Sequence, residues 1–473
     1  MEDIESAVKL VKKLTDAYSQ INFSGLQTRY PPLYVWDKAC NNKELLSGNM
    51  FNTVPRRNHA LYLHFPFCSS KCAFCQQFSC AVTARHYYDD YVGLICKELE
   101  LYADRLGGHG ISGLYFGGGT PTLFDFEKVF RTIAEKYKLS SPYYFNMETT
   151  PYALTKEKLR ALKSMGVTRL NMGLQSLDLR VLKAINRPVL QIEIFPKIYN
   201  EALQTGFDNI GAELVCGLPE QTLESFIKDV AYLISLCPAS IHIYRFMRSP
   251  FTRLFRKAGW QTEEERLTGL RMYNAGVELL EKSGYNDDGG DFISNAKHRN
   301  PFFSLHVPPY PRFFGVIAVG LSALGTHNLC AGTVLLTANV RNWKKYASLV
   351  SKRMFPIDRT CLLNTKQELI RARIISLSIL GRMTRGDFLN LCPNGDFSLK
   401  VLCDRFGKEF QFLKALGKIQ IADDFSEIKW DRTDLQWFRI FYSPAVLEKC
   451  TQAIEDKSFL SDFPHEFSLT ADY

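Results

Sequence analysis

The sequence predicts an α/β fold built as an open, three-quarter (β/α)6 barrel, and three observations lead to this prediction. Short apolar strands alternate with longer amphipathic helices between residues 59 and 290, as in parallel sheets with crossover helices. The alternation repeats six times, which is too few units to close an eight-stranded barrel. Polar residues and glycines follow several strands directly, at the edge where such sheets bind their ligands.

The predicted elements of the barrel follow one another without long gaps. Strands are expected at 60–65, 113–116, 144–147, 169–173, 209–215 and 240–246. Helices are expected at 85–106, 126–137, 156–165, 176–185, 195–205 and 222–236. Pro196 would lie in the first turn of its helix, where its missing N–H does no harm. A further helix at 263–283 is expected to pack against the sheet, and NDDGG at 286–290 to form a turn.

An N-terminal arm is predicted to precede the barrel. Residues 1–58 begin with an amphipathic helix that lacks the apolar core of a signal peptide. A stiff segment rich in proline and aromatic residues follows, from Tyr30 to Trp36. This segment either packs across the main domain or forms a strap over the mouth of the site, where its rings meet a flat substrate.

Two further regions are predicted to follow the barrel, which itself spans 59–290. Residues 291–364 form an extension that completes the site. Residues 365–473 contain helical patterns and then an alternating hairpin at 417–430, which predicts a winged-helix-like α+β domain. We expect this domain to close the substrate pocket rather than to bind DNA, since a fold does not fix a function.

Composition limits the class of protein. The chain has 473 residues, 46% of them hydrophobic, which allows two or three domains with a large core. Thirteen cysteines are an odd number without a small-domain disulfide framework, so we expect a reducing, cytoplasmic compartment. No run of 18 apolar residues is present to span a membrane. The net charge of +9 forms no basic stripe, which favours an acidic small-molecule substrate over nucleic acid.

The chemistry of the chain centres on Cys68, Cys72 and Cys75, spaced C-x3-C-x2-C directly after the first barrel strand. Three thiolates this close together hold three irons of a 4Fe-4S cluster and leave the fourth iron without a protein ligand. A structural zinc site is an alternative, but it needs a fourth ligand, for which Cys80 is the local cysteine. The second alternative is that these cysteines have no shared role.

Other strand ends carry residue types that bind ligands. GGGTPT at 117–122 lies between a strand and a helix, where missing side chains let a ligand approach backbone N–H groups. A tight turn without a ligand is the alternative. Glu148, Gln175 and Glu213 stand at or near the ends of three further strands. Each alone could be an ordinary loop residue, but their shared placement favours side chains that point at one ligand.

These motifs resemble those of the radical S-adenosylmethionine (SAM) superfamily, in which SAM chelates the open iron. YLHFPFC, LYFGGGTPT, ETTP, NMGLQSLDLRVLKAINR, CGLPEQT and FFGVIAVGLSALG resemble, more narrowly, the oxygen-independent coproporphyrinogen III dehydrogenase family. The resemblance spans residues 60–450 and implies a 4Fe-4S cluster held by the three cysteines, with one or two SAM molecules. It implies SAM-contacting positions at Tyr62, Phe74, Gly118, Gly119, Thr120, Glu148, Gln175, Arg187, Glu213 and Leu321.

The resemblance implies radical chemistry but leaves the substrate open. A 5'-deoxyadenosyl radical would take a hydrogen atom from a planar, porphyrin-like small molecule, with an electron from a reductant such as flavodoxin or ferredoxin. The dehydrogenases oxidise a propionate to a vinyl group, whereas class C methyltransferases and cyclopropanases transfer a methyl or methylene group from a second SAM. A non-enzymatic heme chaperone is the third possibility.

Two departures from the dehydrogenase pattern concern the substrate. Gly-Cys follows the third cluster cysteine in the dehydrogenases, whereas Gln76, Gln77 and Phe78 stand here. Glu213 occupies a position where Asp is familiar, so its carboxylate is one methylene further from the backbone. A hydroxyl-binding role remains open to it, with a shifted geometry.

Overall fold

The structure is a computed structural model, in which the described residues are 9, 30–39, 59–105, 110–248, 252–289, 292–295, 315–329, 333–378, 381–385, 387–388 and 398–455. The expected N-terminal helix lies outside these residues apart from Lys9. Within these ranges, thirteen strands join one mixed sheet that stays open. β1 (Asp37–Lys38) is at one edge and β10 (Tyr285–Gly289) at the other.

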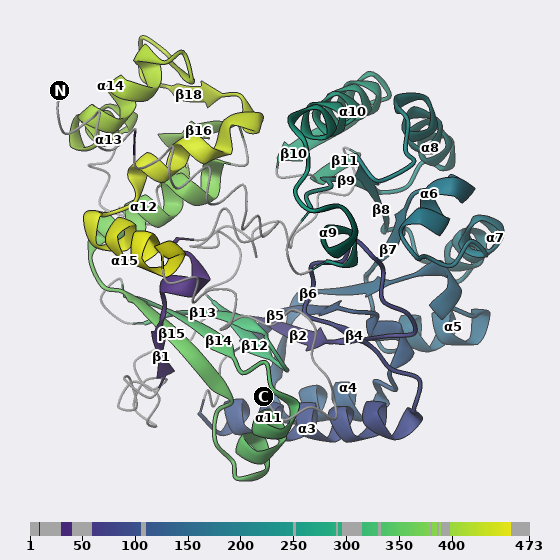
Figure 1. Ribbon diagram of the computed structural model, residues 1–473. Coiled ribbons are helices and arrows are strands. Elements are labelled where there is room, and N and C mark those ends of the chain that lie inside the picture. The colour runs from purple at the N-terminus through teal and green to yellow at the C-terminus, as the bar shows by residue number, and fades with distance from the viewer. Residues whose placement is uncertain are drawn as a thin grey trace.

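Six neighbouring strands of this sheet are parallel, which confirms the predicted partial barrel (Figure 1). They are β2 (His59–Phe65), β5 (Gly110–Gly118), β6 (Lys138–Thr149), β7 (Arg169–Gln175), β8 (Ile210–Cys216) and β9 (Ser240–Arg245). Their side chains alternate between the two faces of the sheet. In β2, Leu61 and Leu63 belong to the main hydrophobic core, whereas Tyr62 lies on the other face among a small interior cluster.

Helices connect these strands and cover their outer face (Figure 1). They are α3 (Arg85–Arg105), α4 (Glu127–Lys136), α5 (Lys156–Ser164), α6 (Leu179–Ala184), α7 (Gln191–Gln204) and α8 (Leu223–Leu236). One detail of the prediction is wrong, because α7 begins at Gln191 and therefore has Pro196 in its interior. The proline nitrogen has no hydrogen to donate there, so the helix lacks one of its bonds.

Two helices follow β9, a short one that the sequence did not predict and a long one that it did. The short helix is α9 (Arg253–Ala258), which begins with Thr252 as its cap. The long helix is α10 (Glu263–Lys282), and its buried residues include Met272 and Leu280, which belong to the main core. This placement matches the predicted packing role.

Antiparallel strands extend the sheet beyond β9. β10 pairs with β11 (Phe292–Asn295), and β11 pairs with β9. The prediction of a turn at 286–290 is therefore wrong for residues 286–289. Pairing with β11 satisfies the backbone groups of this segment in spite of its poor intrinsic strand propensity.

The sheet also extends beyond β2, on the other side of the barrel. β12 (Val316–Val319) pairs with β2 in parallel, and β13 (Leu324–Asn328), β14 (Val334–Asn339) and β15 (Ile357–Leu363) continue in antiparallel order. α11 (Trp343–Ser351) packs against α3. The strand that leads into the cysteines thus has a hydrogen-bonded neighbour on each side. The domain boundaries stay a prediction.

The C-terminal region packs around a second hydrophobic core, which it shares with β14, β15 and the aromatic segment of the arm. Its elements are α12 (Lys366–Leu377), β16 (Arg382–Thr384), α13 (Leu399–Arg405), α14 (Gly407–Ala415), β17 (Ile419–Ile421), β18 (Glu427–Trp430), a 3-10 helix (Arg432–Phe441) and α15 (Pro444–Glu455). The predicted hairpin is the β17–β18 pair, to which β16 adds a third strand. Helices and a small antiparallel sheet are present as expected, and the winged-helix-like assignment stays a prediction.

The aromatic segment of the arm packs into this second core. Tyr30 and Trp36 are each 2% exposed. The Tyr30 hydroxyl donates to Glu368 (2.5 Å) and lies within hydrogen-bond distance of the Ser443 hydroxyl (3.0 Å), both in the C-terminal region. Of the two alternatives, packing is correct for residues 30–39, but the rings pack on the C-terminal region rather than across the main domain as predicted. Burial removes these rings from contact with a substrate, so the strap is wrong for them.

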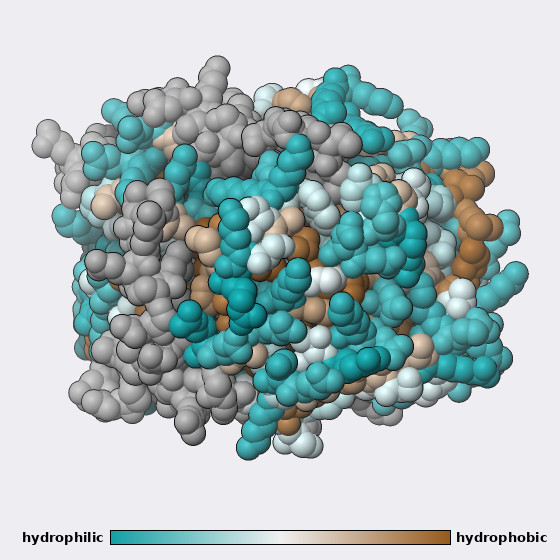
Figure 2. All heavy atoms as spheres, turned by 90° about the horizontal axis from the view of Figure 1, so that it is seen from below, coloured by the Kyte–Doolittle hydropathy of each residue, from teal (hydrophilic) through white to brown (hydrophobic). Residues whose placement is uncertain are grey.

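The remaining surface agrees with the absence of a membrane-spanning run. Among the described residues, no helix combines the length and the apolar character needed to cross a bilayer. The face over α3, α4 and α11 is covered mainly by hydrophilic side chains, with apolar atoms in small patches between them (Figure 2).

Candidate functional site

The three predicted cluster ligands lie on one loop that follows β2. Within this loop, β3 (Phe67–Cys68) and β4 (Cys80–Ala81) pair in parallel. The N–H of Cys80 donates to the carbonyl of Pro66 (2.8 Å) and closes the loop at its base. These contacts bring the two ends of the loop together just after β2, so that the three cysteines are held close to one another.

A buried lysine ties the loop together from within. The Lys71 ammonium donates to the carbonyl of Gln77 (3.1 Å) and to the carbonyl and hydroxyl oxygens of Ser79 (2.7 and 2.8 Å). The hydroxyl of Ser79 lies 3.9 Å from the sulfur of Cys75. Lys71 is 5% exposed, so its positive charge acts on the loop with little screening.

Two of the cysteine sulfurs accept hydrogen bonds from predicted SAM-contacting residues. Thr120 donates to Cys68 and Arg187 donates to Cys72, each across 3.5 Å. Burial raises the pKa of the Cys68 thiol to about 12 and also raises the pKa of Cys72, while the positive charges of Arg187 and Lys71 act in the opposite direction. Iron would deprotonate such thiols outright.

The cysteine loop suits a cluster better than a single ion. Within the residues that the structure describes, no three His, Cys, Asp or Glu side chains converge as one metal ion requires, which disfavours the zinc alternative with Cys80. The thiolates of a 4Fe-4S cluster bind three separate irons and so need not meet at one point. Three thiols, a buried Lys71 and the Arg187 guanidinium fit the charge and ligand set of such a cluster.

The glycine motif lies directly against the cysteine loop. The N–H of Gly119 donates to the carbonyl of Phe65 (2.7 Å). A Cβ added at Gly119 would lie 2.7 Å from the carbonyl of Phe67 and 3.0 Å from the sulfur of Cys68. Gly118 has a φ of +113°, and a Cβ there would lie 2.7 Å from the His64 ring. Glycine is therefore required at both positions by the close approach of two backbones.

Glu148 faces this glycine motif from β6. The N–H of Gly118 donates to one carboxylate oxygen (3.0 Å), and the Tyr115 hydroxyl donates to the other (2.5 Å). Burial, and after it the charge of Glu213, raise the pKa of Glu148 to about 7. The two carboxylates therefore resist being ionised together.

Three predicted SAM-contacting side chains surround Gly173. A Cβ added at Gly173 would lie 2.9 Å from Nε2 of Gln175, 3.5 Å from Oε2 of Glu213 and 3.6 Å from a guanidinium nitrogen of Arg187. Arg187 also donates to the carbonyl of Gly173 and to the sulfur of Cys72. A cradle of an amide, a carboxylate and a guanidinium thus lies beside the cysteine loop, and it fits the polar parts of SAM.

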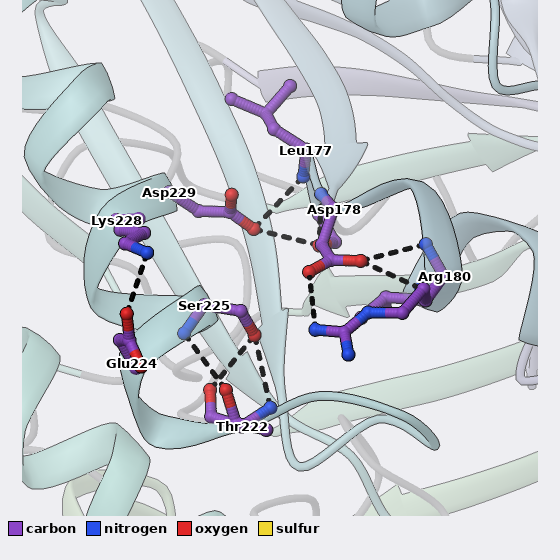
Figure 3. A network of polar contacts seen from close by, with 10 residues as sticks. Leu177, Asp178, Arg180, Thr222, Glu224, Ser225, Lys228 and Asp229 are labelled. Carbon is purple, nitrogen blue, oxygen red and sulfur yellow. Dashed lines mark hydrogen bonds and ion pairs between the residues drawn. The ribbon is translucent and has the colours of Figure 1, made fainter.

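The loop after Gln175 is anchored to α8. Gln175 has a φ of +69°, and within the described chain its side-chain oxygen is buried without a hydrogen-bond partner. The next two residues both donate to one carboxylate oxygen of Asp229, the Ser176 hydroxyl across 2.8 Å and the Leu177 N–H across 2.9 Å (Figure 3). Burial raises the pKa of Asp229 to about 6. This anchor fixes the turn that aims Gln175 at the site.

The remaining predicted positions differ in placement. The Tyr62 hydroxyl lies 2.9 Å from Nδ1 of His64, on the interior face of β2. Phe74 is half-buried and packs against the apolar cluster that includes Leu182 of α6. Leu321 is fully buried, and its N–H donates to the Tyr91 hydroxyl (2.9 Å). All three lie around the end of β2 or its loop, and their roles stay predictions.

Sequence reasoning missed several residues that support the site. Lys71 lies inside the cysteine motif, and nothing in the sequence distinguishes it from an exposed lysine; only the structure shows that it is buried. Glu98 of α3 accepts from the N–H of Gly320 (2.8 Å) and from the Tyr346 hydroxyl (2.6 Å), next to Leu321. Arg169 and His242 occupy interior positions of β7 and β9. For these two, the signal was a charged or polar residue at a strand position whose neighbours are apolar.

Known proteins resemble this chain in sequence. Residues 62–233 match the model of the Radical SAM superfamily. The oxygen-independent coproporphyrinogen III oxidase of Helicobacter pylori (strain J99) is 26% identical over 381 residues, covering 76% of this chain and 81% of the relative. The heme chaperone HemW of Bacillus subtilis (strain 168) is 27% identical over 330 residues, covering 67% of this chain and 82% of the relative.

A solved structure shares the fold across most of the chain. The coproporphyrinogen III oxidase (HemN) from Escherichia coli, a radical SAM enzyme, aligns with a TM-score of 0.73 at 21% sequence identity. The alignment covers 89% of this chain and 96% of that chain. The chain therefore has a radical SAM domain, which implies a 4Fe-4S cluster and SAM, and it is related to the oxygen-independent coproporphyrinogen III oxidases and the HemW heme chaperones.

Proposed function

We propose that Cys68, Cys72 and Cys75 hold a 4Fe-4S cluster and that SAM binds between the glycine motif and the cradle at Gly173. The observation that carries this proposal is the position of Arg187, which donates to Cys72 on one side and to Gly173 on the other. One side chain thus joins the predicted cluster loop to the predicted SAM cradle. When bound, cluster and SAM would supply a 5'-deoxyadenosyl radical.

The residues of this chain would bind and orient SAM rather than act as acids or bases. Gly118 and Gly119 leave the backbone open to a ligand beside Cys68. Glu148 already accepts from Tyr115 and Gly118, whereas Oε2 of Glu213 faces the cradle and, when ionised, can only accept from a donor on the ligand. SAM offers donors in its amino group, its adenine amine and two ribose hydroxyls, and we propose the hydroxyls as the partners of Glu213.

For the substrate, we propose a planar, porphyrin-like small molecule that undergoes oxidative decarboxylation, with electrons from a cytoplasmic reductant such as flavodoxin or ferredoxin. The related coproporphyrinogen III oxidases support this choice. A heme chaperone is the second candidate, supported by the HemW relatives.

Methyl or methylene transfer from a second SAM is the third candidate, and a contact near the cysteines supports a substrate other than that of the dehydrogenases. Gln76, which stands where the dehydrogenases have glycine, donates to the carbonyl of Met247 (2.5 Å). It thereby joins the cysteine loop to the chain that follows β9. This edge of the site has a different shape from one lined by Gly-Cys, and a different substrate would follow.

The test is anaerobic reconstitution with iron and sulfide, followed by reduction with SAM and mass spectrometry of the products. Coproporphyrinogen III and heme are the two substrates to compare. We expect 5'-deoxyadenosine together with a vinyl product. S-adenosylhomocysteine beside 5'-deoxyadenosine would instead select methyl or methylene transfer, and stable heme binding without SAM cleavage would select the chaperone. A chain that assembles no cluster would overturn all three.

A further inference from the structure

A network of polar side chains lies inside the barrel and contacts Glu213. Its members come from interior positions of two strands, namely Arg169 and Asn171 of β7 and Ser240, His242 and Tyr244 of β9. Gly211 on the intervening strand leaves room for them, because a Cβ there would lie within 2.9 Å of atoms of this network. The network is therefore closely packed and has a defined geometry.

Arg169 is the cation of this network. It is 2% exposed, and it donates to the side-chain oxygens of Asn209 and Ser240, each across 2.5 Å, and to Nε2 of His242 across 3.3 Å. The Asn209 and Ser240 side chains carry no charge to compensate it. A buried guanidinium needs a compensating negative charge, and the carboxylate whose charge acts on Arg169 is Glu213.

The contact with Arg169 determines where His242 carries its proton. A guanidinium group has donors only, so in this contact Nε2 of His242 accepts. The Ser240 hydroxyl lies 3.1 Å from the same Nε2, and because its oxygen already accepts from Arg169, its proton is available to donate to Nε2 as well. In a neutral imidazole with an accepting Nε2, the proton is on Nδ1. Nδ1 of His242 lies 3.5 Å from the Tyr244 hydroxyl and 3.8 Å from Oε1 of Glu213. The donor face of the ring is thus turned toward the carboxylate.

The two oxygens of Glu213 have different surroundings. Oε1 accepts from the Asn171 amide and from the Tyr244 hydroxyl (3.3 Å). Oε2 lies on the side of Gly173, where the cradle is formed. The protein therefore occupies one oxygen of the carboxylate and presents the other one.

We propose that Arg169 is a positioning residue for Glu213. By donating to His242, Arg169 fixes the Nδ1–H tautomer of the ring. The donors of the network, Asn171 and Tyr244, then remain directed at Oε1 of Glu213. Oε2 is thereby aimed at a hydroxyl of the ligand. The inference rests on the proposed function, since SAM is the ligand whose ribose hydroxyls Oε2 would meet.

The test compares the binding of two ligands to cluster-reconstituted protein without reductant, so that no turnover occurs. The ligands are SAM and a SAM analogue that lacks both ribose hydroxyls. We expect Arg169→Met to raise the Kd of SAM about tenfold, and the Kd of the analogue by less than about twofold. Arg169→Lys keeps a charged donor and should restore most of the affinity for SAM. The absorption spectrum of the cluster monitors its integrity in every variant.

A second pair of variants tests the tautomer without removing the buried charge. His242→Asn places an amide N–H near the position of Nδ1, whereas His242→Gln places one near Nε2. The Kd of SAM should rise less than about threefold in the first and about tenfold in the second. The reverse order would overturn the tautomer argument and the inference with it.

The outcomes separate the inference from the proposed function. If the wild-type chain binds no SAM, the proposed function is wrong. If it binds SAM and Arg169→Met leaves both Kd values unchanged or raises both equally, the proposed function stands. Arg169 then has only a structural role, and the inference is wrong.

Discussion

The cysteine loop and the interior of the barrel are built in opposite ways. The loop is contiguous in sequence, from Phe67 to Ala81, and is held by backbone pairing and by one lysine. The interior brings together residues from strands far apart in the chain, such as Arg169 and Ser240, and holds them by side-chain hydrogen bonds. The comparison teaches that the predicted cluster loop depends on local sequence, whereas the predicted SAM cradle depends on strand register.

The largest expected effect breaks the loop itself. Cys72→Ala should abolish cluster assembly, because a 4Fe-4S cluster with an open iron needs all three thiolates. Iron and sulfide content after anaerobic reconstitution measures the loss. Cys80→Ala is the matched control, since Cys80 lies on the same loop outside the triad. Loss of the cluster in Cys80→Ala with retention in Cys72→Ala would refute the ligand assignment.

A second, smaller effect should follow from removing the lysine that ties the loop. Lys71→Met takes away three hydrogen bonds and a positive charge next to the thiolates, so we expect cluster affinity to fall about tenfold to a hundredfold. Competition with an iron chelator measures this fall. Lys163→Met is the control, because Lys163 of α5 also donates to a backbone carbonyl, that of Gly206, which belongs to neither the cysteine loop nor the glycine motif. Equal cluster loss in both variants would mean that Lys71 acts only through general stability.

A third effect is a pH dependence of stability, and it arises from Glu98, which joins α3 to Gly320 and Tyr346. Burial raises the pKa of Glu98 to about 7, above its ordinary value near 4.5. The folded state therefore binds this proton more tightly than the unfolded chain does. The resulting stabilisation is full below about pH 4.5 and is lost as the pH rises through about 7. Buried Glu148 and Asp229 contribute with the same sign.

We expect the free energy of unfolding to fall between about pH 4.5 and 7, and to fall by about 1 to 3 kcal/mol less in Glu98→Gln. Chemical denaturation at several pH values measures this. Glu100→Gln on the same helix is the control and should keep the wild-type slope. A Glu98→Gln variant with an unchanged slope would show that Glu98 titrates alike in both states.

The smallest expected effect lies outside both regions. Tyr30→Phe removes the hydrogen bonds to Glu368 and Ser443, and should cost about 1 to 2 kcal/mol of stability. Thermal unfolding measures this loss. SAM and substrate affinity should stay unchanged, because the arm packs on the C-terminal core rather than over the site. A changed substrate affinity at equal stability would show instead that the arm contacts the substrate, as the strap alternative predicts.

The sequence was sufficient wherever the signal was local. Strand and helix alternation predicted the six parallel strands, and cysteine spacing predicted the loop. It was insufficient where pairing partners lie far apart. β12 joins β2 from more than 250 residues away, and β10 is a strand only because β11 and β9 complete its sheet. Arg169 and His242 were missed for the same reason, since their partners depend on the register of β7, β8 and β9.

The parallel pairing of β12 with β2 has a practical consequence for anyone who wishes to shorten this protein. A fragment that stops at residue 290 would keep every cysteine of the triad and every glycine of the motif. Without β12, however, β2 would become an exposed edge strand, whose unpaired backbone groups could pair with other copies of the chain. The smallest useful version of this protein therefore extends well past its recognisable motifs.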